Sequence, residues 1–229
     1  MAKIGVDAVA RALAILKAFG PERREMTLTE LATATDLYKS TVLRLTATLE
    51  EGGFVTRGDD RLYRPGPELW RLGTLYRQSL DLGDLVRPTL HRLVDATGET
   101  ASFYIRDGNQ RICLYRVNSP RAVRHHLDEG QRLPLNRGAA GHVLAAYGEG
   151  TGASRKKVLA QGYYVSLGER DPEVAAAAVP VLDGQGKLRG ALSVSAIRSR
   201  FDARAQKLAL TSLKLEAQAL VGLLPASEA

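Results

Sequence analysis

Residues 27–55, TLTELATATDLYKSTVLRLTATLEEGGFV, predict a helix, a short turn, a second helix and the first strand of a hairpin. Thr27 or Thr29 can cap the first helix, because threonine is favoured at that position, and apolar residues then recur at helical spacing. The second helix is expected from about Lys39 to Glu51, where a glycine pair ends it. Its core stripe is Val42, Leu45, Thr46 and Leu49.

The opposite face of the second helix carries the residues that could contact DNA. Its first turns are where a recognition helix meets base edges. Arg and Lys suit guanine or phosphate, Ser and Thr suit several bases, and an apolar side chain can meet a thymine methyl group. The candidates are Lys39, Ser40, Thr41, Leu43 and Arg44, with Thr27 as a further candidate at the start of the motif. A helical hairpin with a solvated polar face remains the alternative, since such hairpins are common.

A β-hairpin is predicted to follow the two helices. Its strands are expected at residues 54–57 and 61–64, joined by a turn rich in Gly and Asp. Arg57 and Arg61 lie beside the tip, where the wing of a DNA-binding domain touches phosphate. A further helix is predicted before the motif, over residues 7–19. Three helices followed by a hairpin is the order of a winged helix-turn-helix.

Composition is consistent with this fold but does not prove it. The 229 residues, 45% of them hydrophobic, are enough for one large domain or two small ones. The net charge of +7 favours polyanionic partners, although most of the excess lies beyond residue 80. The single cysteine, Cys113, excludes an internal disulfide framework and a multi-cysteine zinc site. We predict a cytoplasmic protein, because no apolar run approaches the roughly 20 residues that span a membrane and no signal peptide begins the chain.

Beyond the wing, the sequence predicts a linker helix and a second domain. The expected boundaries are residues 1–66 for the winged helix-turn-helix, 67–80 for the linker helix and 81–229 for the second domain. The linker helix has more apolar residues than a solvated helix needs. It could therefore pack on a second chain or on this chain's own C-terminal domain.

The second domain is predicted to combine helices with an antiparallel sheet, so that the fold class is α+β. We expect strands at residues 100–106, 111–117, 123–127, 175–182 and 188–197. Helices are expected at residues 84–97, 139–147, 155–161 and 202–223, the last capped by Asp202. Helices on one side of the sheet would leave its other face free to line a cavity.

A ligand could bind where the predicted helix at residue 139 begins. Asn136 could cap this helix, and small residues would let a ligand approach its free amides, where the helix dipole favours an anion. Gly138 and Gly141 could equally serve only to let the helix pack closely on the sheet. Weaker ligand candidates are Arg116 and Arg124, charges inside predicted strands that an edge strand or a salt bridge would explain equally well. Phe103 is a further candidate, although a core role is sufficient to explain it.

The sequence does not favour an enzyme. His125 and His126 are neighbours in a predicted strand and would point to opposite faces, so they cannot readily share a metal. The known metalloprotease, nucleophile-elbow and phosphate-loop motifs are absent from the sequence. The Gly-rich run at residues 148–152 lacks the lysine and hydroxyl of a nucleotide loop and is expected to be a helix end and loop. We therefore expect no catalytic residue, cofactor or metal.

The chain resembles the IclR-type bacterial transcription regulators over nearly its whole length. In the N-terminal part the resemblance lies in VDAVARALAILKAF, in LTELATATDLYKSTVLRLTATLEEGGFV and in YRPGPELWRLG. In the C-terminal part it lies in EGQRLPLNRGAAGHVLAAY, GYYVSLGE and AAAAVPVLDGQGKLRGALSVS. One departure is Asp36, where the family usually has Gly, but Asp tolerates a left-handed backbone better than most residues.

The resemblance implies a winged helix-turn-helix followed by a GAF-like effector-binding domain. It also implies a homodimer or homotetramer that binds a near-palindromic operator in double-stranded DNA and senses a small organic or aromatic acid. By position, Ala139 and Ala140 would offer amides and Ser193 and Ser195 hydroxyls to a carboxylate, and Glu169 matches an acidic position near the family's pocket. The predicted function is a ligand-responsive regulator of a catabolic operon. The alternative is a small-molecule sensor that binds no specific operator.

Overall fold

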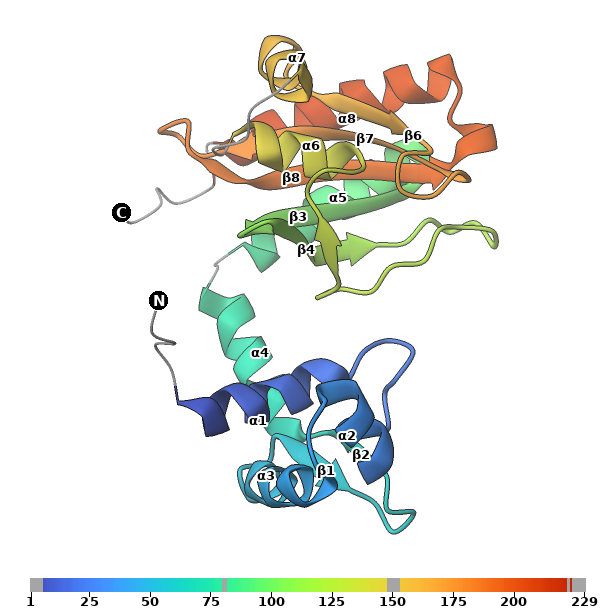
Figure 1. Cartoon of the computed structure of the whole chain (residues 1–229). Coiled ribbons are helices and arrows are strands. Elements are labelled where there is room, and N and C mark those ends of the chain that lie inside the picture. Colours follow the sequence, from blue (N-terminus) through green and yellow to red (C-terminus); the bar gives the residue numbers. More distant parts are fainter. Residues whose placement is uncertain (1–5, 80–81, 148–152, 222, 224–229) are drawn as a thin grey trace. The chain divides into compact units, whose positions relative to one another are not determined.

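The computed structural model describes residues 6–79, 82–147, 153–221 and 223 (Figure 1). The chain divides into two compact units, Met1–Leu80 and Asp81–Ala229. No helix within the described ranges is long and apolar enough to cross a membrane. The expected loop at residues 148–152 lies outside the described residues.

The N-terminal unit has the predicted order of three helices, a hairpin and a further helix. Its elements are α1 (Asp7–Ala18), α2 (Leu28–Thr35), α3 (Lys39–Glu51), β1 (Val55–Arg57), β2 (Tyr63–Pro65) and α4 (Pro67–Ser79). The side chains of Ile15, Leu31 and Val42 are fully buried and join the first three helices in one core. Thr46 is buried as predicted, because its position on α3 faces this core.

Local features fix both ends of α2: a pair of hydrogen bonds at its start and a left-handed residue at its end. The hydroxyl of Thr27 accepts from the Glu30 amide at 3.2 Å, and the Glu30 carboxylate accepts from the Thr27 amide at 2.7 Å. This reciprocal capping box starts α2. Asp36, which stands where glycine is usual, takes the left-handed conformation with φ 55° and ends the helix. The turn therefore forms without glycine.

The wing differs from the prediction in its second strand, which begins at Tyr63 rather than Arg61. Arg61 lies in the turn with φ 62°, and its amide donates to the Gly58 carbonyl at 2.9 Å. The carboxylate of Asp60 also accepts from the Leu62 amide at 3.0 Å. These bonds extend the turn by two residues.

The C-terminal unit is built on a six-stranded antiparallel sheet with the order β5-β4-β3-β8-β7-β6. Its strands are β3 (Thr100–Asp107), β4 (Gln110–Val117), β5 (Arg132–Pro134), β6 (Tyr164–Leu167), β7 (Val174–Leu182) and β8 (Leu188–Ile197). The short edge strands β5 and β6 were not predicted. The predicted strand at residues 123–127 is wrong. Side chains bond its carbonyls instead of a neighbouring strand: Arg200 binds the carbonyl of Val123 and Arg116 that of His125.

Helices cover both faces of this sheet, which contradicts the expectation of helices on one side only (Figure 1). The helices are α5 (Gly83–Thr97), α6 (Ala139–Ala146), α7 (Ala153–Gln161) and α8 (Ala203–Val221), with a 3₁₀ turn at Arg198–Arg200. The helices α5 and α8 lie on one face, whereas α6 packs on the other face against Tyr104, Cys113 and Ala178. Asp202 caps α8 as predicted, since its carboxylate accepts from the Ala205 amide at 2.8 Å.

Candidate functional site

The exposed face of α3 gathers the predicted DNA-contacting residues. Lys39, Ser40, Leu43 and Arg44 are exposed and Thr41 is half-buried, while the opposite side of α3 forms part of the core. No side chain caps the start of α3. Its first amides and the positive end of its dipole are thus available to an anion such as a DNA phosphate. Thr27 differs from the others, because its hydroxyl serves the capping box of α2.

Sequence reasoning missed Tyr38, which occupies the N-cap position of α3 and is 85% exposed. An aromatic side chain so exposed beside the polar face of α3 is placed to contact sugar or phosphate, because its hydroxyl can donate a hydrogen bond. The signal was its position immediately before the predicted helix.

Two of the three arginines of the wing have guanidinium groups that could contact a DNA phosphate, whereas the third is engaged in ion pairs. Arg57 and Arg61 are both exposed, and neither forms an ion pair with a described residue. Arg64 pairs instead with Glu25 at 2.8 Å and Asp60 at 2.6 Å. The hydrogen bonds to Asp60 and Glu25 raise the pKa of Arg64, and the bond from Arg64 lowers the pKa of Asp60 to about 2. Arg64 therefore stabilises the turn.

A cavity lies between the start of α6 and the sheet face that α6 covers. Its volume is about 40 Å³. Four predicted residues line it: Ala139 and Ala140 at the start of α6, and Ser193 and Ser195 on β8. The alternation of β8 thus places both serines on one face, as expected.

The entry of the chain into α6 differs from the prediction. Asn136 is exposed and is not the cap; Gly138 holds the N-cap position with φ 77°, which favours glycine. The carboxylate of Glu169 accepts from the Gly138 amide at 3.0 Å. A Cβ on Gly141 would lie 2.5 Å from the Leu135 carbonyl oxygen, so this glycine does allow close packing.

Ser193 and Glu169 already have partners within the chain. Ser193 is buried and donates to the Ala177 carbonyl at 3.0 Å, which leaves its oxygen able to accept. The Glu169 carboxylate lies 2.9 Å from Nε2 of His142, whose ring stacks on Tyr164 at 4.2 Å between centroids. Glu169 therefore orders the start of α6 from beside the cavity.

Three weaker candidates lie away from the cavity wall. The buried guanidinium of Arg116 donates to Asn118 at 3.0 Å, to Ser102 at 3.2 Å and to the His125 carbonyl at 2.6 Å. Arg124 is exposed in the loop that was expected to be a strand. Phe103 is fully buried, and alternation with Tyr104 directs it to the opposite sheet face.

Two arginines that the sequence did not single out line the cavity instead. Arg111 is only 3% exposed; its Nη1 donates to the carbonyls of Arg137, at 2.8 Å, and Pro134. Burial lowers the pKa of Arg111, yet arginine stays protonated in proteins. Arg170 contacts Nε2 of His125 at 2.6 Å. No carboxylate in the described part of the chain forms an ion pair with either arginine. Alternation from the buried Cys113 could have indicated that Arg111 points inward.

Arg170 and Arg116 influence the pKa of His125. Burial, followed by the charges of Arg170 and Arg116, lowers the pKa of His125 to about 4. The ring is therefore neutral at pH 7, and its Nε2 can accept from Arg170. The wall of the cavity is cationic, with a neutral imidazole within it.

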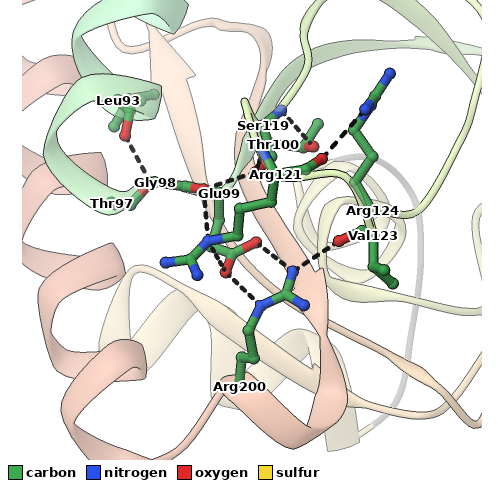
Figure 2. A network of polar contacts seen from close by, with 10 residues as sticks. All are labelled: Leu93, Thr97, Gly98, Glu99, Thr100, Ser119, Arg121, Val123, Arg124 and Arg200. Carbon is green, nitrogen blue, oxygen red and sulfur yellow. Dashed lines mark hydrogen bonds and ion pairs between the residues drawn. The ribbon is translucent and has the colours of Figure 1, made fainter.

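A polar network holds the loop that carries His125 (Figure 2). The buried carboxylate of Glu99 accepts from Arg200 at 3.0 Å and lies 3.4 Å from Arg121. The Ser119 hydroxyl donates to the Gly98 carbonyl at 2.7 Å. The loop between β4 and β5 is thus anchored to the sheet and to the 3₁₀ turn before α8.

Comparison with known proteins gives one consistent family. The model of the IclR helix-turn-helix domain matches residues 8–59, and the model of the bacterial transcriptional regulator IclR C-terminal domain matches residues 74–155 and 153–221. The chain is 29% identical over 223 residues to the HTH-type transcriptional regulator XynR of Escherichia coli, covering 86% of this chain and 88% of that protein.

Solved structures agree with the fold. An IclR transcriptional regulator from Alicyclobacillus acidocaldarius matches with a TM-score of 0.82 and 28% identity, covering 95% of this chain and 98% of that one. An IclR homologue from Microbacterium hydrocarbonoxydans, solved in complex with 4-hydroxybenzoate, matches with a TM-score of 0.77 and 21% identity, over 93% and 99% of the two chains.

Proposed function

Because the chain belongs to the IclR family of DNA-binding transcription regulators, we propose that it controls a catabolic operon in response to a small organic or aromatic acid. The observation that carries the proposal is the outer face of α3, where basic, hydroxyl and apolar side chains are exposed together on a winged helix-turn-helix. Such a face suits the major groove, and the wing arginines suit phosphate.

The operator would be near-palindromic, because a homodimer presents two α3 helices about one helical turn, roughly 34 Å, apart. Support for a second copy comes from α4, where Trp70 is 72% exposed, Leu75 49% and Tyr76 52%. A second chain packed on α4 would cover this apolar surface. A tetramer would be a dimer of such dimers.

The acid would bind in the cavity beside α6. The amides of Ala139 and Ala140 would bind a carboxylate, with the hydroxyls of Ser193 and Ser195 as further partners. Arg111 adds a positive charge on the same wall. The 4-hydroxybenzoate complex of a protein with the same fold supports the class of ligand.

Fluorescence anisotropy of the DNA upstream of the chain's own gene tests the proposal. We expect tight binding to this DNA, weak binding to a shuffled duplex of equal length, and a shift in affinity when an acid such as 4-hydroxybenzoate or an aliphatic carboxylate is added. Equal affinity for both duplexes would contradict operator recognition. It would favour the second candidate, a sensor that binds acid in the same cavity but no specific DNA.

A further inference from the structure

We infer that the effector of this chain carries two acidic groups, because Arg111 and Arg170 place two cationic positions on the wall of one cavity. The inference rests on the proposed function, in which this cavity is the effector site. It narrows the ligand from an acid in general to a small dicarboxylate. Support for a dicarboxylate comes from the surroundings of the two arginines, from the positions of the nearby acids and from the size of the cavity.

Arg111 marks the first position, next to the start of α6. The guanidinium is buried, and only Nη1 has carbonyl partners, those of Pro134 and Arg137. Its Nε has no hydrogen-bond partner among the described residues. A buried charge costs several kcal/mol unless an anion compensates it. A carboxylate at the α6 amides would lie beside this group and provide that compensation.

Arg170 marks the second position, beside His125. Its contact with Nε2 of His125, at 2.6 Å, involves a neutral ring and does not offset its charge. Arginine binds carboxylates through two parallel N–H groups, so a second acidic group is the partner that its chemistry favours. The charge of Arg170 also lowers the pKa of Arg111, which indicates that the two guanidinium groups share one field.

No acid among the described residues forms an ion pair with Arg111 or Arg170, although the charge of Asp171 acts on the neighbouring His125. No Asp or Glu is among the described residues that line the cavity. Glu169, at the start of α6, is bonded to the Gly138 amide and to His142. One bound carboxylate would offset one positive charge and leave the other. A dianion would offset both, and the cavity volume of about 40 Å³ limits it to a small molecule.

Calorimetry with matched pairs of acids tests the inference. The pairs share a skeleton and differ in one carboxylate: butyrate and succinate, hexanoate and adipate, benzoate and phthalate or terephthalate. We expect at least one diacid to bind about tenfold or more tightly than its monoacid, since each tenfold step corresponds to about 1.4 kcal/mol of an added ion pair. Diacids that all bind no more tightly than their monoacids would overturn the inference.

Single substitutions of the two arginines show which carboxylate each of them binds. Arg170→Gln should reduce the affinity for the best diacid to about that of its monoacid and leave the monoacid affinity nearly unchanged. Arg111→Gln should weaken both. Arg124→Gln is the matched control, because Arg124 lies exposed in the same loop as His125 and away from the cavity wall. If Arg111→Gln fails to fold, as judged by circular dichroism, Arg170→Gln alone decides.

The result separates this inference from the proposed function. Monoacids that bind as tightly as diacids, with no effect of Arg170→Gln, would overturn the dicarboxylate and leave an acid sensor in place. No binding of any acid would overturn both the inference and the acid-sensing part of the proposal. Operator preference in the absence of ligand, measured separately, decides DNA binding.

Discussion

Arg44 is the residue on α3 from which the sharpest loss of sequence recognition is expected. It is exposed in the first turns of the helix, beside Lys39 and Ser40. If its guanidinium pairs with a guanine, Arg44→Ala should lose about 1–3 kcal/mol of specific binding, with a much smaller loss on nonspecific DNA. Anisotropy with operator and shuffled duplexes measures both. Arg204→Ala, at an exposed arginine on α8, serves as the control; an Arg44→Ala protein with undiminished operator preference would refute the assignment.

His125 should make the stability of the folded protein depend on pH. The pKa of His125 is about 4 in the folded protein, against an ordinary value of 6.5. Between these pH values the unfolded chain binds a proton that the folded chain does not. Stability therefore falls as pH drops from about 6.5 towards 4. Urea unfolding of wild type and His125→Asn at pH 7 and pH 5 measures it.

The variant should lose less stability than wild type over that pH range. Equal losses would show that His125 does not titrate abnormally. Proton NMR of the imidazole resonances gives an independent check, since the His125 signal should not shift until the pH is well below 6.

The sequence was sufficient to predict which residues lie on the exposed face of α3, but it did not identify all the residues that line the cavity. The pattern Ser-x-Ser on one strand was sufficient to place Ser193 and Ser195 together, because alternation is a local rule. Arg111 and Arg170 come from β4 and from the loop after β6, which only the strand order brings to one cavity. Arg116 and Arg124 were predicted as ligand contacts because they are charges inside predicted strands. The structure commits the guanidinium of Arg116 to Asn118, Ser102 and the His125 carbonyl.

The wing hairpin is expected to contribute to the salt dependence of DNA binding. Arg57 and Arg61 are exposed on the hairpin. Replacing both with Ala should weaken binding to all duplexes similarly and lower the slope of log affinity against log salt by up to about two. Replacing Arg204 and Lys207, two exposed bases on α8, should leave the slope unchanged. A wild-type slope in the wing variant would show that the hairpin does not contact the backbone.

Strand β8 gives a prediction about the ligand. Ser193→Ala/Ser195→Ala removes two hydroxyls from the cavity wall. Each hydrogen bond is worth about 0.5–1.5 kcal/mol, so the dissociation constant of the acid should rise roughly tenfold or more, as measured by calorimetry. Ser199→Ala, an exposed serine beyond the strand, is the control. Operator binding without ligand should survive, and an unchanged ligand affinity would place the pocket elsewhere.

Helix starts could be predicted where a capping residue marks them, whereas very short strands could not. The capping residues Thr27 and Asp202 are visible in the sequence, so the starts of α2 and α8 could be predicted. The strands β5 and β6 have three and four residues, too few for alternation to be visible. The loop at 123–127 has a strand-like composition, but arginine side chains from distant elements bond its carbonyls, and no local pattern reports such bonds.

Assembly of the whole molecule is proposed to depend on α4. Leu75→Glu should place a charge on the exposed apolar surface that a second chain is proposed to cover, and so shift the protein towards the monomer. Analytical ultracentrifugation measures the shift, and operator affinity should fall with it because a monomer reaches one half-site. Leu159→Glu, at an equally exposed leucine on α7, is the control. A dimer that persists in Leu75→Glu would exclude this surface.

The family was accessible from the sequence. The motifs that carry the resemblance extend over both units, and they match the two family models at residues 8–59 and 74–221. Helices on both faces of the sheet were not predicted. Periodicity identifies the buried side of a helix but not the sheet face that the helix covers.

The anchored loop of Figure 2 has a practical consequence for anyone who wishes to convert this regulator into a biosensor. Glu99, Arg121 and Arg200 hold the loop from outside the cavity, so these anchors do not depend on the residues that line it. Val174 and Ala176 on β7 line the cavity and belong to neither the network nor the start of α6. If the cavity is the effector site, as proposed, a mutant library directed at these two positions should vary ligand preference while the loop keeps its anchors.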